Sequence, residues 1–443
     1  MFRKTTLFTA LFLSSMALSA ESGSVQEYPA ILSAHAVMPA NTIITAPKDT
    51  PTDLKVSGKF TTGERNLALE SIEGQSNGRP TGISLPFDGQ PIQGHSGIKK
   101  MSDGSYWLLT DNGAGSKANS PDFMLYLNQY DIDFDNNQFK HLKTIFLKDP
   151  NQQVPFRIQN EGTDTRYLTG ADFDPESFQF AGGYLWIGDE FGPYLIQAET
   201  DGTVINIFET QLNGKTLRSP DHYKMTTPGN PTQMLDFEVL RSKGFEGMAV
   251  SADGRKLYPL LEGALAGTDG SALEILEFDV NEQAWTGNHW QYPLAEKGLA
   301  IGDFNMIDNE YGLIIERDNG EGVTEFACSD EKGPNCFAKA QLPAIKRIYK
   351  IKMNDENVNQ AVTKVGYIDL LNIQDPNQVA KKPLSEGKFV FPFFTIENVD
   401  VVDKETIIVG NDNNLPFSSS RLPNQADDNE LILLNVKALL EAK

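Results

Sequence analysis

A unit made of an extended segment, a tight turn and a short apolar strand that ends in acidic residues recurs along the chain. Its clearest copy is residues 168–193, LTGADFDPESFQFAGGYLWIGDEFGP, in which the apolar strand Tyr184–Ile187 leads into Asp189 and Glu190. Related copies are found at 94–113, 244–263, 301–320 and 395–414. Repeated units of this kind are typical of blades arranged in a ring, because a single unit cannot bury its apolar faces alone.

The repeat predicts an all-β fold, a β-propeller of about six blades (five to seven) with long insertions in its inter-strand loops. Successive copies start about 55–95 residues apart, which is longer than a minimal blade. Stretches such as YWLLT at 106–110 and YLWIG at 184–188 are apolar on both faces, so we expect them to be inner strands packed between neighbouring blades. The alternative, a pair of β-sandwich domains, does not explain the repeated order of turn, strand and acid.

Residues Met1–Ala20 have the layout of a secretory signal peptide. Arg3 and Lys4 precede an apolar run, which is followed by small residues up to Ala20. Cleavage is expected after Ala20, with Ser19 as an alternative. We therefore expect an exported protein, periplasmic or secreted, without a membrane span.

The remainder is expected to form a single domain. Residues 21–58 carry four prolines and few periodic apolar positions, so they are predicted to be an extended lead-in. Residues 59–443 then form the propeller. Cys328 and Cys336 flank a short loop and predict a disulfide bond, since no histidine lies near enough to complete a zinc site.

The charge balance limits the class of partner. The chain has 38 basic and 60 acidic residues, a net charge of -22 at pH 7. Such a surface repels nucleic acid and anionic membranes and favours cations, although the charge could serve solubility alone. We expect a small-molecule substrate, and the sequence does not indicate the oligomeric state.

Acidic side chains follow the apolar strand of every copy. If the copies form a ring, these side chains approach a common axis, where carboxylates repel each other unless a cation neutralises them. Oxygen ligands suit hard cations, and Ca²⁺ tolerates irregular geometry. The alternative is that Asp and Asn only stabilise local turns. The predicted metal ligands are Asp111, Asp189, Glu190, Glu262, Asp303, Glu316 and Asp412.

A second set of polar residues precedes each turn and supplies candidate catalytic groups. Glu246 and Glu397 are predicted to act as ligands or bases, with Asp172 at the corresponding point of the clearest copy. His95, beside Ser96, occupies the corresponding place in the first copy and is a further catalytic candidate. Arg317 could contact a substrate anion, or it could hold the two acids that flank it. The stretch GHSG at 94–97 is not the GxSxG elbow of serine hydrolases, and no HExxH zinc motif is present.

Several of these stretches resemble the bacterial family called esterase-like activity of phytase. They are LTGADFDP, WIGDEFGP, GFEGMAVSADGRKLYPLLEG, LIIERD and IENVDVV, and the likeness extends from about Lys59 to the end. The resemblance implies an exported β-propeller that hydrolyses phosphate or carboxylic esters. The chain lacks the Asp- and Lys-rich pattern of calcium-dependent propeller phytases, which argues against phytate itself as the substrate. The alternative function is a non-catalytic binding or scaffold propeller with a structural cation.

Overall fold

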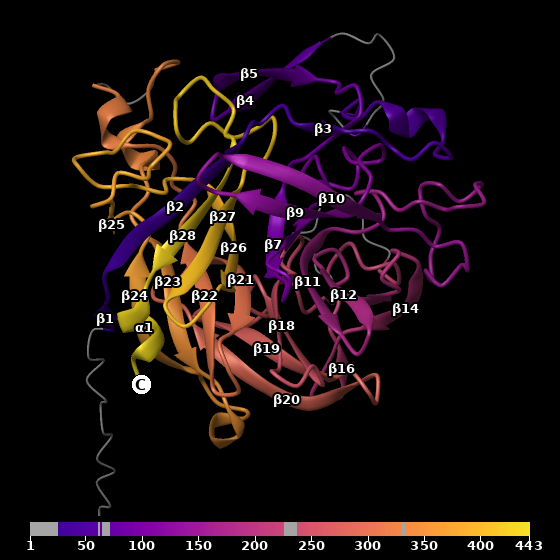
Figure 1. The fold of residues 1–443 in the computed structure, drawn as a ribbon. Coiled ribbons are helices and arrows are strands. Elements are labelled where there is room, and N and C mark those ends of the chain that lie inside the picture. Colours follow the sequence, from indigo (N-terminus) through magenta and orange to yellow (C-terminus); the bar gives the residue numbers. More distant parts are fainter. Residues whose placement is uncertain (1–24, 61–62, 64–70, 226–236, 330–332) are drawn as a thin grey trace, which may run out of the picture.

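The computed structural model describes residues 25–60, 63, 71–225, 237–329 and 333–443. Five sheets of four or five strands account for most of the regular structure in this part of the chain, and they form a five-bladed β-propeller (Figure 1). The predicted fold is confirmed, and the blade number is close to the expected six. The predicted signal peptide lies outside the described residues.

Each of the first three blades is an antiparallel sheet of four strands. Blade one consists of β7 (His95–Lys100), β8 (Tyr106–Thr110), β9 (Tyr126–Asp133) and β10 (Gln138–Phe146). Blade two consists of β11 (Pro175–Ala181), β12 (Tyr184–Asp189), β13 (Tyr194–Ala198) and β14 (Val204–Glu209). Blade three consists of β17 (Phe245–Val250), β18 (Lys256–Leu261), β19 (Ala272–Asp279) and β20 (Ala284–Pro293).

The last two blades each gain a fifth strand. Blade four consists of β21 (Ala300–Met306), β22 (Tyr311–Arg317), β23 (Lys346–Lys352), β24 (Thr363–Asp369) and the parallel β1 (Gln26–Glu27). Blade five consists of β26 (Thr395–Val401), β27 (Thr406–Asp412), β28 (Asn429–Asn435), β2 (Ala30–Met38) and the parallel β25 (Ile373–Gln374).

Short elements decorate the ring. Three two-stranded pairs are β3 (Ile43–Ile44) with β6 (Gln90–Pro91), β4 (Ile72–Ser76) with β5 (Arg79–Leu85), and β15 (Gln211–Leu212) with β16 (Lys215–Thr216). The helical elements are the 3₁₀ turns Thr52–Lys55, Thr324–Phe326, Lys339–Gln341 and Asp355–Asn357, and the α-helix α1 (Lys437–Glu441). In the described part of the chain no helix is long and apolar enough to cross a membrane.

The five copies of the sequence repeat are the first hairpins of the five blades. The first strand of each hairpin is the innermost one, because β7, β11, β17, β21 and β26 contact one another in a closed ring. The expected inner strands β8 and β12 are the second strands of their blades, and their predicted packing between neighbouring blades is confirmed. They are apolar on both faces because they are buried between blades, where Leu109 and Leu185 belong to one core cluster.

Crowding at the axis explains why the innermost strands are rich in small and polar residues. A Cβ atom on Gly302 of β21 would lie 1.9 Å from the carbonyl oxygen of Ile396 in β26. Only glycine lets the two backbones approach this closely.

The ring is closed by pairing between the two ends of the chain. Strand β2 runs antiparallel to β28, from Ile31 opposite Asn435 to Met38 opposite Asn429 (Figure 1). Residues 30–38, expected to be part of a lead-in, are thus a strand of blade five. A bulge between Leu32 and Ala34 breaks the alternation of buried side chains, so the sequence pattern conceals this strand. Because these residues complete an existing blade, the chain has five blades rather than six.

The predicted disulfide bond is confirmed: the sulfur atoms of Cys328 and Cys336 lie 2.06 Å apart. It closes a loop that follows β22, outside the five sheets.

Ring closure predicts the effect of shortening a single side chain in β2. Leu32 is fully buried in the core cluster between blades four and five. Leu32→Ala should lower the free energy of unfolding by about 2–5 kcal/mol, as for other buried leucines. Urea denaturation followed by circular dichroism measures this change. The control Ser33→Ala alters the neighbouring exposed bulge residue and should shift stability by no more than about 0.5 kcal/mol. Equal effects of the two substitutions would contradict this account of closure.

Candidate functional site

Every innermost strand contains a β-bulge near the start of its pairing with the second strand. The register shifts just after His95, Pro175, Phe245, Ile301 and Ile396. A bulge inserts an extra residue and redirects its side chain. The residues that directly follow these five positions are Ser96, Glu176, Glu246, Gly302 and Glu397 in blades one to five.

A second set of residues comes from the end of the second strand of each hairpin, next to the start of the first strand. The partners of the five pre-bulge residues are Thr110, Asp189, Leu261, Glu316 and Asn411. Each is followed directly by a charged residue, and these are Asp111, Glu190, Glu262, Arg317 and Asp412. The hairpin geometry therefore places two residues from each blade at one end of the ring.

Carboxylate oxygens from different blades meet at this end. One group, with atoms within 4.8 Å of one another, joins Glu176, Glu246 and Glu397 of blades two, three and five. A second group joins Glu246 to Glu190 and Glu262 within the same distance. Three blades thus converge on a common volume.

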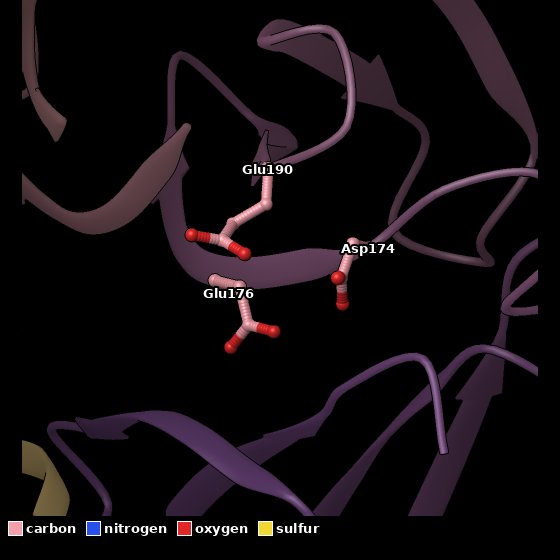
Figure 2. Close-up of side chains that lie close together, drawn as sticks. All are labelled: Asp174, Glu176 and Glu190. Carbon is pink, nitrogen blue, oxygen red and sulfur yellow. The ribbon is translucent and has the colours of Figure 1, made fainter. Parts of the chain in front are cut away.

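Blade two contributes one more carboxyl group. Asp174 lies just before β11 and forms a third group with Glu176 and Glu190, again within 4.8 Å (Figure 2). In Figure 2 Glu190 reaches from the end of β12 toward Glu176 and Asp174. Asp111 and Asp412 adjoin this volume, since each interacts electrostatically with Glu397.

We call these eight side chains the central acid cluster. Seven of them are buried, with exposed fractions of 9% or less, and Asp111 is partly buried. The members are Asp111, Asp174, Glu176, Glu190, Glu246, Glu262, Glu397 and Asp412.

Several oxygens of the central acid cluster lack a partner. Asp174 Oδ1, Glu190 Oε1 and Glu246 Oε1 are buried without a hydrogen bond. Buried polar atoms are normally paired, so unpaired carboxylate oxygens facing one another indicate a site for a ligand that supplies positive charge.

Burial and mutual repulsion make ionisation of the cluster costly. Burial, then the charges of Asp111 and Asp189, raise the pKa of Asp174 to about 8. The same combination of burial and neighbouring carboxylates raises the pKa of Glu176 and Glu246 well above the usual range. The folded protein therefore holds protons here at neutral pH unless a cation replaces them.

Two cations touch the cluster. Arg317 Nη2 donates to Glu397 Oε1 at 2.9 Å, and Ser96 Oγ donates to Glu397 Oε2 at 3.0 Å. Lys243 Nζ forms an ion pair with Glu262. Arg317 does not bridge the two acids that flank it in sequence; its ion pair instead crosses to blade five. This geometry leaves the guanidinium Nε atom buried without a partner.

Two predicted metal ligands, Asp189 and Asp303, accept hydrogen bonds from backbone amides instead. Asp189 accepts hydrogen bonds from the amides of Asp174 at 2.9 Å and Gly192 at 2.7 Å. Asp303 accepts one from the amide of Val399 at 2.9 Å. Asp189 directly precedes Glu190, and Asp303 directly follows Gly302. Because side chains alternate along a strand, both point away from the axis of the ring.

Glu316 and His95 also lie outside the cluster. Glu316 is fully buried and accepts from the hydroxyl of Tyr292 in β20 and from Lys364 Nζ in β24, both at 2.5 Å. The His95 ring is buried with both nitrogens unpartnered, and burial lowers its pKa to about 3. A neutral imidazole with no neighbouring carboxylate is a poor proton acceptor, so the structure does not support the catalytic role expected for His95.

Sequence reasoning missed Asp174, Glu176 and Lys243. It chose Asp172 as the counterpart of Glu246, but Asp172 accepts from the amides of Thr169 and Gln159 in a local turn. One signal could have found Glu176. In every copy the residue that follows the bulge and the charged residue at the end of the hairpin are separated by about 15 residues. Glu176 is that far before Glu190.

Some solved structures have a distant likeness to this chain. A GH43 β-1,3-galactosidase with galactodeoxynojirimycin is 12% identical, with 82% of this chain and 93% of that chain covered and a TM-score of 0.38. The calcium-binding protein regucalcin from Agrobacterium tumefaciens is 10% identical, with 78% and 92% covered and a TM-score of 0.36. Neither likeness is close enough to carry an argument about function.

Sequence comparisons are more informative about family. An uncharacterized secreted protein from Arthroderma benhamiae is 29% identical over 113 residues, which span 22% of this chain and 22% of that protein. The sequence model of the phytase-like family, described as esterase-like activity of phytase, matches residues 90–415. This region includes the first hairpins of all five blades and every member of the central acid cluster. The chain is therefore a member of the phytase-like family.

Proposed function

We propose that this protein is an exported, metal-dependent hydrolase of phosphate or carboxylic esters. The observation that carries the proposal is the convergence of buried carboxylates from three blades with unpartnered oxygens among them. The disulfide bond and the partial likeness to a secreted protein support export.

The donor set of the central acid cluster fits Ca²⁺. It consists of carboxylate oxygens, which hard cations prefer, in an irregular arrangement that Ca²⁺ tolerates. Glu176, Glu190 and Glu246 each belong to two of the three close groups, so they are the central ligand candidates, with Asp174, Glu262 and Glu397 around them. A bound cation would offset the repulsion, attract a substrate oxygen and make water more acidic.

The chain's own residues have separate tasks in this proposal. Glu246 keeps one oxygen free of hydrogen bonds, so it can accept a proton from an attacking water. Arg317 carries a fixed positive charge at the edge of the cluster, where it can hold an anionic oxygen of the substrate. Ser96 donates to Glu397 and so restricts the orientation of that carboxylate.

The raised pKa values predict how stability depends on pH. Between about pH 4 and pH 8 the folded protein binds more protons than the unfolded chain, because the pKa of Asp174 rises from 3.8 to about 8 and those of its neighbours also rise. The metal-free protein should therefore lose stability as pH increases through this window. We expect its melting temperature to fall by several degrees from pH 5 to pH 8, and Ca²⁺ to restore it most at pH 8.

Thermal denaturation after exhaustive chelation, with and without added Ca²⁺, measures this effect. Asp174→Asn should reduce the pH dependence because an amide does not ionise, whereas the exposed control Asp131→Asn should leave it unchanged. A metal-free protein equally stable at pH 5 and pH 8 would show that ionisation of the cluster carboxyl groups does not destabilise the folded state.

Replacement of Glu246 tests catalysis. Glu246→Gln should lower kcat by about 100-fold or more, because the amide cannot accept the proton. The assay uses aryl phosphates, phosphodiesters, aryl acetates and lactones with Ca²⁺ and after chelation. The folded state should remain intact, since the substitution removes a repelling charge.

The matched control is Glu282→Gln, an exposed residue remote from the axis, which should retain full activity. If the Ca²⁺-loaded wild-type protein turns over none of these substrates while Ca²⁺ still raises its melting temperature, the scaffold alternative with a structural cation replaces the hydrolase.

A further inference from the structure

A cavity of about 420 Å³ lies directly beside the central acid cluster. Its lining includes Glu262 of the cluster together with Arg317 and Lys243, the two cations bound to cluster carboxylates. The volume is in the range of small-molecule sites. The cavity therefore adjoins the carboxylates at which the proposed hydrolysis takes place.

The two cations mark the boundary between the cavity and the cluster. The Arg317 side chain is 5% exposed and is held by Glu397 of blade five, while Lys243 is 41% exposed and is held by Glu262 of blade three. The ion pair with Glu262 holds the Lys243 ammonium group at this boundary. An anion held by both side chains would lie next to the carboxylates.

Part of the cavity lining is an apolar wall. Leu273 of β19 and Leu294 and Leu299 of the segment that follows β20 line it. Ala264 and Ala300 add small side chains that leave room for a ring or an alkyl chain. These side chains favour an apolar group. Asn319 also lines the cavity, but its Oδ1 already accepts from Arg317 Nη1 at 2.8 Å, so the lining offers few side-chain hydrogen bonds to a polyhydroxylated group.

We propose, building on the hydrolase function above, that the substrate is a phosphomonoester of an apolar alcohol. Because both cations lie beside the cluster, the charged group of the substrate is the one that is hydrolysed. This condition fits a phosphomonoester, whereas the reacting group of a carboxylic ester is neutral. The oxygen of one water forms the new bond to phosphorus, the bond from phosphorus to the alcohol oxygen breaks, and one proton of that water ends on the alcohol.

The same lining disfavours inositol polyphosphates. Among the residues that line the cavity, Lys243 and Arg317 alone are cationic, and both are already paired with carboxylates. A polyphosphate would leave several phosphate groups against leucine side chains or near Glu262, without counter-charges.

Binding can be measured without turnover. With Ca²⁺ present, calorimetry should show that 1-naphthyl phosphonate, which cannot be hydrolysed, binds at least tenfold more tightly than methyl phosphonate. Inositol hexakisphosphate should bind no more tightly than methyl phosphonate. Equal binding of the two phosphonates, or tighter binding of the polyphosphate, would overturn the proposal.

Two variants separate the roles of the wall and the cations. Leu294→Ala should lower kcat/KM for 1-naphthyl phosphate about tenfold and leave methyl phosphate unchanged, because only the larger alcohol reaches the wall. Lys243→Gln should raise KM about tenfold for both phosphates and leave the neutral 1-naphthyl acetate unaffected. The exposed controls Leu142→Ala and Lys140→Gln on β10 should leave kcat/KM and KM unchanged for all three substrates.

These measurements distinguish the substrate proposal from the hydrolase proposal. Selective binding of naphthyl phosphonate without turnover of any ester would refute the hydrolase and retain the cavity as a ligand site. Turnover of naphthyl phosphate that neither Leu294→Ala nor Lys243→Gln alters would refute the cavity assignment and retain the hydrolase.

Discussion

Repulsion among buried carboxylates is the constraint around which the centre of this protein is built. Glu176, Glu246 and Glu397 come from three blades, and nothing in their own hairpins would bring them together. Closure of the ring does so, through contacts between successive innermost strands and through the pairing of β2 with β28. The apolar cores between blades must offset the cost of holding like charges in a small volume.

That cost gives the site its chemical character. Protons or a cation must compensate the eight carboxyl groups, since Arg317 and Lys243 supply only two positive charges. The compensation can be exchanged, because several oxygens have no protein partner. A buried cluster whose charge depends on what it binds suits a metal-dependent centre, as proposed here, better than a rigid structural ion-pair network.

Different parts of a blade supply the polar and apolar parts of the proposed substrate site. Bulges in the innermost strands direct carboxylates toward the axis. The cations are Arg317, at the end of β22, and Lys243, just before β17. Leu273 and Leu294 belong to the third strand of blade three and to the segment that follows its fourth strand, so the apolar wall can vary without disturbing the axial groups. Substrate preference and catalytic chemistry are thus carried by separate elements of one fold, as in many enzymes built on rigid scaffolds.

Much of the architecture follows from patterns within single hairpins. The order of turn, apolar strand and acid recurs in 94–113, 168–193, 244–263, 301–320 and 395–414, and each copy became the first hairpin of one blade. The convergence of Glu190, Glu246, Glu262, Glu397 and Asp412 could be anticipated, because equivalent positions of a ring must approach its axis. The disulfide between Cys328 and Cys336 also followed from local spacing.

Other features depend on register and on distant contacts. A one-residue bulge decides that Glu176 faces the axis while Asp172 and Asp189 bond to nearby backbone amides, and no local pattern shows where a bulge lies. Strand β2 belongs to blade five only because β28, about 400 residues later, offers it a free edge. The sequence by itself determined the repeated hairpin and its acidic ends, since strand, turn and charge are local properties. The tertiary structure alone decided the number of blades, the members of the acid cluster and the cavity beside it, because each depends on which backbone edges and side chains meet across the closed ring.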